Sequence, residues 1–191
     1  AFLHWSGFVS FMLGGEARVD YSLANRTLLF DLERDDWSDE LLELTGIGRD
    51  KLPAAVPAGT VIGRVARAIA DELGLPPGIP IVSGGHDQCC SGLGCGVIEP
   101  GQAMYGMGTY LCMMPVFARR LDSAAMMARG LNTEDHVVPG QYVTFIYNQG
   151  SVLVKWFRDT FASAERQHAK TLGQDVYAAL LREMPVTPSP V

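Results

Sequence analysis

The chain has 191 residues, 48% of them hydrophobic and 19% charged, and its formal net charge is −6 at pH 7. This length suits one ordinary domain or two small ones, with enough apolar residues for a real core. Because lysine and arginine never cluster and the balance is acidic, the composition speaks against a nucleic-acid partner. No apolar run is long enough for a membrane span, so we expect no membrane partner either.

The chain opens on an apolar run in which Phe2, Trp5, Val9 and Met12 recur at helical spacing. This spacing predicts a packed helix, which the following glycine pair would end. The run is shorter than the about 20 residues of a membrane span, and it lacks the basic start and cleavage site of a signal peptide. Because the chain begins abruptly on alanine, we expect that the true N-terminus is missing.

A short helix with both ends marked is expected in the segment DWSDELLELTGI, residues 36–47. Ser38 can accept a hydrogen bond from the free N–H groups of the first turn. Asp39 and Glu40 suit the positive end of the helix dipole. Gly46 would end the helix.

The next segment, residues 52–63, contains two prolines and is expected to be a loop. A second helix is expected at residues 64–75, where Gly74 would end it. Three of its apolar residues share one face: Val65, Ile69 and Leu73. A turn then leads into a short, buried strand at residues 79–83.

A glycine-rich helix is expected directly after this strand, beginning near Asp87. A glycine inside a helix costs about 1 kcal/mol relative to alanine, so several of them indicate close backbone packing or a ligand. The glycines concerned are Gly92, Gly94 and Gly96.

Hairpins and helices are expected in the second half of the chain. Residues 102–114 are typical of a strand, a tight turn and a second strand, and residues 137–148 of a further hairpin. Amphipathic helices are expected at residues 151–164 and 174–184. We expect the apolar side chains of the first of these helices, Trp156 and Phe157, to lie in the core. The proline-rich end, residues 185–191, would be a loop.

The order of these elements indicates a mixed α/β fold, because helices alternate with strands first and hairpins follow. The EPG sequence within residues 97–101 marks a domain boundary. The methionine-rich stretch from Met104 to Met127 is expected to fill irregular core space.

The four cysteines lie among small and apolar residues, which predicts buried, reduced thiols in a cytoplasmic protein. Cys89 and Cys90 are adjacent and make a poor disulfide framework, and the others are Cys95 and Cys112. His86 could join Cys89 or Cys90 on a metal ion. No second CxxC or HxxxH completes a four-ligand set, so no metal site is predicted.

Several common catalytic motifs are absent from the sequence. There is no GxxxxGK[ST] phosphate loop, no GxGxxG after a strand and no GxSxG. The four histidines form no recognisable triad with a serine. The sequence therefore does not predict a protease or a dehydrogenase.

Two polar features about twenty residues apart remain as candidates for chemistry. One is the strand that ends in Gly-Gly-His-Asp-Gln, which places Asp87 and Gln88 where α/β sheets present groups to ligands. The other is the turn with Gly108 and Thr109, whose N–H groups and hydroxyl could contact phosphate oxygens. A carboxylate facing a phosphate cradle is what phosphoryl transfer requires. Asp87 could instead be only the N-cap of its helix, and Thr109 only a strand residue.

The sequence resembles the FGGY family of carbohydrate kinases, which includes xylulokinase, gluconokinase and glycerol kinase. The resemblance covers most of the chain, and its ordered set of segments is specific although each segment alone is weak. The segments are DYSLANRTLLFDL (20–32), DWSDELLELTGI, GTVIGRV, GLPPGIPIVSGGHDQ, GLGCGVIEPGQ, GMGT and SVLVKWFRD (151–159).

The resemblance implies an actin-like, hexokinase-like ATPase fold of the ribonuclease H-like type. Residues 1–97 would be the C-terminal part of the sugar-binding N-terminal domain, and residues 98–191 the beginning of the nucleotide-binding C-terminal domain. Asp87 would be the general base that activates a sugar hydroxyl for attack on ATP, and Gln88 would lie beside it in the sugar pocket. Gly108 and Thr109 would bind the phosphates of ATP, which Mg²⁺ accompanies.

The chain departs from the family pattern at two positions, His86 and Tyr110. Tyr110 could narrow the phosphate site or point into the core, and His86 is expected to pack or line the site. The family's first phosphate loop and its adenosine-binding segment are not found. We therefore expect an internal fragment that is inactive alone, although the whole protein would be a kinase.

The resemblance suggests a ketopentose such as xylulose as the acceptor, and a polyol or a sugar acid stays open. The alternative function is a non-catalytic protein that binds a sugar or a nucleotide on the same fold. A homodimer is also conceivable, because a truncated domain pair would expose apolar surface.

Overall fold

The computed structural model describes residues 1–183 and divides into two compact units. The first unit contains residues 1–106 and 112–146, and the second contains residues 107–111 and the chain from Tyr147 onward. The expected proline-rich loop at residues 185–191 lies outside the described residues. The domain boundary expected near residue 97 stays a prediction.

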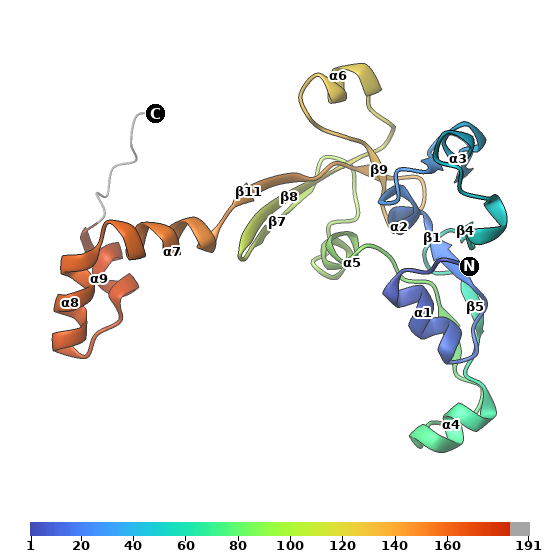
Figure 1. Cartoon of the computed structure of the whole chain (residues 1–191), viewed down its shortest axis with the longest axis horizontal. Coiled ribbons are helices and arrows are strands. Elements are labelled where there is room, and N and C mark those ends of the chain that lie inside the picture. Colours follow the sequence, from blue (N-terminus) through green and yellow to red (C-terminus); the bar gives the residue numbers. More distant parts are fainter. Residues whose placement is uncertain (184–191) are drawn as a thin grey trace. The chain divides into compact units, whose positions relative to one another are not determined.

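The first unit contains most of the secondary structure (Figure 1). Its helices are α1 (Trp5–Met12), α2 (Tyr21–Asn25), α3 (Asp39–Thr45), η1 (Arg49–Lys51), α4 (Arg67–Leu73), α5 (Asp87–Gly94) and α6 (Ser123–Met127). Its shorter strands are β1 (Arg18–Asp20), β2 (Phe30–Asp31), β3 (Asp36–Trp37), β4 (Ala54–Val56), β5 (Val61–Arg64), β6 (Pro80–Val82), β9 (Glu134–Asp135) and β10 (Tyr142–Val143). The longer strands β7 (Ala103–Met107), β8 (Tyr110–Phe117) and β11 (Ile146–Gln149) continue from it into the second unit.

These strands form three two-stranded pairs and one larger sheet. β1 pairs parallel with β4, whereas β2–β3 and β5–β6 are antiparallel pairs. The five-stranded sheet has the order β11-β8-β10-β9, with β7 also paired to β8. The expected mixed α/β class is confirmed, as are the hairpin around residues 106–109 and the hairpin around Pro139 and Gly140.

The local signals for helix ends are confirmed where a cap residue was identified. Ser38 is the N-cap of α3 and accepts the N–H of Leu41, and Gly46 ends this helix with φ of 69°. Gly74 ends α4 in the same left-handed conformation. Such caps depend on neighbouring residues alone, which is why the sequence predicts them.

The loop expected at residues 52–63 is wrong, because this segment contains β4 and β5. Pro53 and Pro57 flank β4 without entering it, and the strand pairs with β1 in the register Val19↔Ala55. Parallel pairing with a strand more than thirty positions away supplies the hydrogen bonds, and a local proline count does not reveal such a partner.

The burial expected for two apolar helix faces is also wrong. α1 forms as expected but none of its residues is buried, and Trp5 is 82% exposed. In the second unit, Trp156 and Phe157 are about half exposed and pack mainly on Phe161. Helical spacing identifies the apolar face of a helix but not what covers it.

The core of the first unit consists of three apolar clusters. The cluster beneath the five-stranded sheet holds α5 through Cys89 and contains Met114, which is completely buried. Its other members are Met104, Cys112, Val116, Val137, Val143 and Phe145. The core role expected for the methionines is thus confirmed for Met104, Met114 and Met126. It is wrong for Met107, Met113 and Met127, which are exposed.

The glycines of α5 show one case of close packing. A side chain at Gly92 would collide with the end of Met114, whereas Gly94 and Gly96 have open space. All four cysteines are free thiols, but only Cys89 and Cys112 are buried. The burial expected for the other two thiols is therefore wrong.

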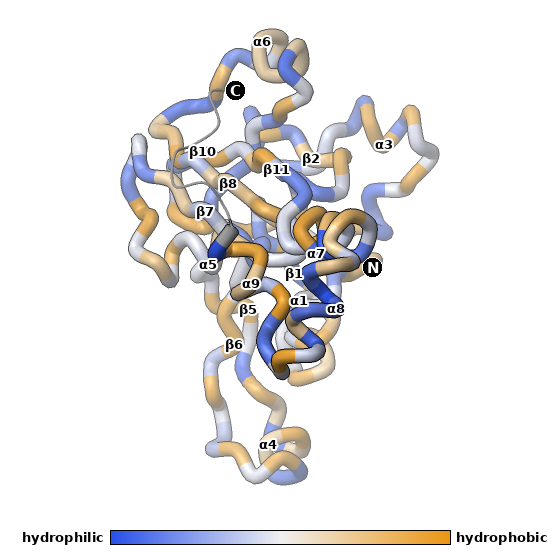
Figure 2. The backbone as a smooth tube through the Cα atoms, turned by 90° about the vertical axis from the view of Figure 1, so that its left-hand side faces the viewer, coloured by the Kyte–Doolittle hydropathy of each residue, from blue (hydrophilic) through white to orange (hydrophobic). Residues whose placement is uncertain are grey.

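The second unit is a small group of helices: α7 (Ser151–Thr160), α8 (Ser163–Leu172) and α9 (Val176–Glu183). α7 and α9 confirm the two expected helices, and α8 was not expected. Figure 2 shows α8 as largely hydrophilic, in contrast to the apolar residues on α7 and α9. α8 has few large apolar residues, so its apolar stripe is a weak signal in the sequence.

A cluster of buried acids is a further feature of the first unit. Asp20, Glu134 and Asp135 are each less than a tenth exposed. Arg26 pairs with Glu134 at 2.6 Å, and the N–H of Asp135 donates to Asn25 Oδ1 at 2.6 Å. The composition of this cluster was not predicted, because its members come from separate segments.

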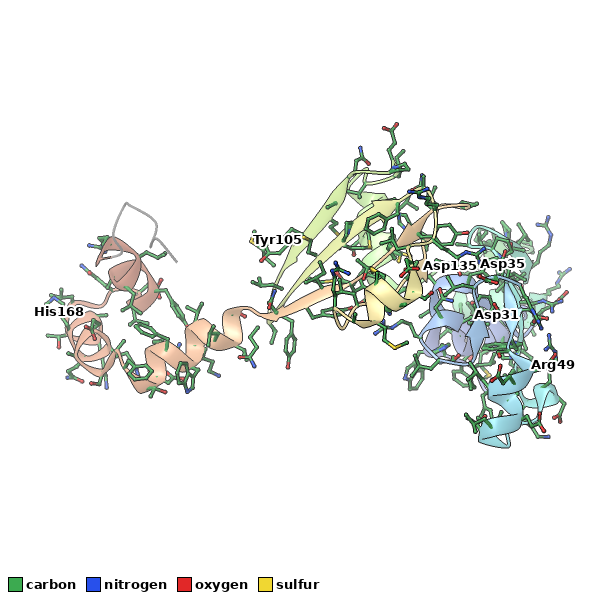
Figure 3. The ribbon with its side chains drawn as sticks, turned by 90° about the horizontal axis from the view of Figure 1, so that it is seen from above. Asp31, Asp35, Arg49, Tyr105, Asp135 and His168 are labelled. Carbon is green, nitrogen blue, oxygen red and sulfur yellow. The ribbon has the colours of Figure 1, made fainter. Side chains whose placement is uncertain are left out.

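Burial raises the pKa of Asp135 to about 7, and the nearby Asp35 adds to the increase. Both aspartates are labelled in Figure 3. Burial likewise raises the pKa of Asp20, although its hydrogen bonds with Ser22 oppose the rise. The folded state therefore binds a proton at Asp135 more tightly than the unfolded chain does.

Replacing Met114 by alanine is expected to lower the free energy of unfolding by about 2–5 kcal/mol, because it leaves a cavity in a fully buried position. The matched control is Met127→Ala, since Met127 is 76% exposed and its loss is expected to cost less than about 0.5 kcal/mol. Urea titration of both variants measures the difference. Equal losses would contradict the assignment of Met114 to the core.

Replacing Asp135 by asparagine is expected to stabilise the protein at pH 8, because the unfolded chain deprotonates this carboxyl near pH 4 and the folded state only near pH 7. Stability contributed by the protonated group is present below pH 4 and is lost as the pH rises to about 7. The advantage of the variant should therefore shrink as the pH falls from 7 toward 4. Urea titrations at pH 8, 6 and 4.5 test this, and a pH-independent difference would refute it.

Candidate functional site

Asp87 lies at the turn where β6 leads into α5, in the first unit. It is the first residue of α5, and His86 is the N-cap, without a side-chain capping bond. The Asp87 side chain is 80% exposed. Its Oδ1 accepts the N–H of Gln88 at 2.7 Å, which satisfies one free donor of the first turn. Asp87 thus supports the helix start slightly, while most of the carboxylate stays open to a ligand.

His86 packs beside this carboxylate, as expected for a residue that lines the site. Its ring lies 5.0 Å from the ring of Phe145, and its Nε2 lies 3.4 Å from Asp87 Oδ1. Burial lowers the pKa of His86 below its usual 6.5, an effect that the Asp87 carboxylate only partly opposes. The imidazole is therefore mainly neutral at pH 7, and it does not cancel the charge of Asp87.

Gln88 follows Asp87 and is half-buried against the sheet. A side chain at Gly106 of β7 would lie 3.4 Å from Gln88 Oε1, so the amide rests directly over this glycine. Asp87 and Gln88 are thus brought together at the start of α5, as expected, with Gln88 facing β7.

Gly108 and Thr109 form the tight turn between β7 and β8, and both are exposed. They belong to the second unit, so the two expected pairs of site residues lie in separate units. Inside the hairpin, the N–H of Gly108 donates to the carbonyl of Tyr110 at 3.2 Å. The exposed hydroxyl of Thr109 is the group that this turn offers to a ligand.

The carbonyl oxygens of this turn are tied to the start of α7. Ser151 N–H donates to Gly108 O at 3.0 Å, and Gly150 N–H donates to Thr109 O at 3.1 Å. A side chain at Gly150 would lie 2.6 Å from Gly108 O, so only glycine permits this approach. The sequence did not predict this contact between the turn and the start of α7. Its only sign in the sequence was Gly150, a glycine directly before an expected helix.

Tyr110, one of the two departures from the family pattern, is 62% exposed. Its ring therefore does not point into the core. The expectation that it narrows a phosphate site stays a prediction.

Within residues 1–183, no group of three or more His, Cys, Asp or Glu side chains could hold a metal ion. The same part of the chain contains no helix long and apolar enough to cross a membrane.

Residues 1–94 match the model of the FGGY family of carbohydrate kinases, N-terminal domain. The autoinducer-2 kinase of Yersinia enterocolitica is 35% identical over 177 residues, which are 92% of this chain and 33% of that protein. The autoinducer-2 kinase of Escherichia coli K12 is 36% identical over 181 residues, which are 94% of this chain and 33% of that protein. The chain thus spans 33% of the length of these curated relatives.

Solved structures of sugar kinases share the fold. The xylulose kinase from Rhodospirillum rubrum is 27% identical, with a TM-score of 0.73 over 94% of this chain and 35% of that one. A kinase from Brucella ovis, described as a xyloylose kinase, has a TM-score of 0.77 at 22% identity, over 96% of this chain and 35% of that one. These likenesses confirm the expected actin-like ATPase fold. With a family-model match and relatives that cover nearly all of its length, the chain belongs to the FGGY family of carbohydrate kinases.

Proposed function

We propose that the whole protein transfers the γ-phosphoryl group of ATP to a hydroxyl of a small sugar or related compound, with Asp87 as the general base. The observation that carries this proposal is an exposed carboxylate, fixed at a strand-to-helix turn and accompanied by a neutral histidine. A general base must be open to the hydroxyl that it deprotonates, and the exposed carboxylate of Asp87 meets this condition.

In the proposed reaction, the acceptor hydroxyl donates its proton to Asp87 as its oxygen attacks the γ-phosphorus. The new oxygen–phosphorus bond forms while the bond to the β-phosphate oxygen breaks, and ADP leaves. The side-chain amide of Gln88 would hold the acceptor beside the carboxylate. Because Gln88 rests on Gly106, little ordering of this side chain is needed when the acceptor binds.

Gly108 and Thr109 would lie against the phosphates of ATP, and the Thr109 hydroxyl would be the group that contacts them. Their turn suits this task because hydrogen bonds to Gly150 and Ser151 already fix its backbone, while the Thr109 hydroxyl is exposed. Mg²⁺ would be held largely by the nucleotide, since such ions bind through one or two carboxylates, phosphates and water.

The acceptor is proposed from the names of the relatives. The curated proteins at 35–36% identity are autoinducer-2 kinases, whereas the xylulose kinase structure is 27% identical. We therefore favour autoinducer-2 as the first acceptor to test and keep xylulose, our expectation from the sequence, as the second. Polyols and sugar acids complete the panel.

The cellular setting is part of the same proposal. Four free cysteines, two of them exposed, suit a reducing cytoplasm. A homodimer stays a prediction, to be checked by light scattering on the whole protein.

Replacing Asp87 by asparagine is expected to reduce acceptor-dependent ADP release by about 10²–10⁴-fold, the usual contribution of a general base. Because the side chain is 80% exposed, thermal unfolding should change little. The measurement is ADP release by the whole protein across the panel, which also identifies the acceptor.

The matched control is Asp39→Asn. Asp39 is the first residue of α3, as Asp87 is of α5, and its side chain is 78% exposed. Wild-type activity is expected for this variant. Equal activity of both variants would refute Asp87 as the base. A folded protein that binds ATP but releases no ADP with any acceptor would favour the alternative, a non-catalytic binding protein.

A further inference from the structure

A chain of hydrogen bonds connects a buried acid to the backbone directly before Asp87. Asp20 caps α2 by accepting the N–H groups of Ser22 at 2.8 Å and Leu23 at 3.4 Å. The hydroxyl of Ser22 donates to the same carboxylate oxygen and accepts the N–H of His86 at 2.8 Å. Asp20 and Ser22 are 2% and 1% exposed, so the connection is shielded from water.

The direction of each bond in this chain is determined by chemistry. A backbone N–H can only donate, so the Ser22 oxygen must accept from His86. The single proton of the Ser22 hydroxyl is then left for Asp20, which accepts as a carboxylate. The serine can therefore hold only one orientation, and this orientation aims a lone pair at the turn that carries Asp87.

Close packing restricts the same turn. A side chain at Gly85 would collide with Val137 and would lie 3.0 Å from the Ser22 oxygen. The ring of His86 is held against Phe145. The backbone before Asp87 is thus enclosed by apolar contacts, and Ser22 provides the hydrogen bond that orients it.

We propose that Ser22, held in place by Asp20, is a positioning residue for Asp87. This inference rests on the proposed function, because it assigns Ser22 a role in placing the general base. Ser22 is remote from the reacting atoms and acts through the His86 peptide. Its hydrogen bond prevents the first turn of α5 from rotating, so the carboxylate stays aligned with the acceptor hydroxyl.

The test compares Ser22→Ala with Ser38→Ala in the whole protein. Both changes remove a serine hydroxyl that accepts a backbone N–H near a helix start, but Ser38 caps α3 and not the Asp87 turn. We expect Ser22→Ala to lower kcat about 10–100-fold with KM changed less than about threefold, because a displacement of about 1 Å has such an effect on reacting groups. Ser38→Ala should keep the wild-type kcat.

A second measurement does not depend on activity. Amide hydrogen exchange of a peptide spanning residues 84–88, followed by mass spectrometry, should become about tenfold faster in Ser22→Ala and stay unchanged in Ser38→Ala. Unchanged exchange in Ser22→Ala would overturn the inference, as would an equal loss of kcat in both variants. A wild-type protein that phosphorylates no acceptor would refute the proposed function itself and the positioning role with it. Activity in the wild type alongside a normal Ser22→Ala variant would refute the positioning role alone.

Discussion

The close approach of Gly85 to Val137 and Ser22 is the constraint on which the turn before Asp87 depends. Because no side chain separates these segments, the N–H of His86 can reach the Ser22 hydroxyl. The chain then enters α5 in one direction, with Cys89 in the core and Asp87 at the surface. An exposed carboxylate is thereby placed by buried contacts, which is how a folded protein holds a polar side chain precisely enough for chemistry.

The electrostatics of this region follow from the same arrangement. Asp20 and Asp135 are buried, and burial raises the pKa of both carboxyl groups. The hydrogen bonds of Asp20, as the cap of α2 and as the acceptor for the Ser22 hydroxyl, oppose the increase in its pKa. Arg26, a cation of the same region, is paired with Glu134.

The sequence predicted what depends on neighbouring residues and failed where distant segments meet. Ser38 and Gly46 were predicted correctly as the two ends of α3, because a helix cap depends only on the residues of its own turn. β4 was expected to be a loop because its partner, β1, lies far away in the chain. The same division holds in the candidate site: Asp87 and Gln88 were proposed from a local motif and stay a prediction, whereas the bond between Ser22 and His86 joins residues 64 positions apart. The spacing of apolar residues within one segment does not indicate such a contact between distant segments.

The two parts of the candidate site are stabilised in different ways, and this has a consequence for specificity. Asp87 and Gln88 depend on side-chain packing of the first unit, where Cys89 and Gly106 hold α5 and β7 in place. Gly108 and Thr109 depend on backbone bonds to Gly150 and Ser151, in which side-chain identity matters little apart from the need for glycine. A single substitution can change the side-chain packing around an acceptor. It has less effect on the shape of a turn that is held by backbone hydrogen bonds. Under the proposed function, the choice of acceptor would therefore depend on the packed part of the candidate site, and the contact with ATP on the turn held by backbone hydrogen bonds.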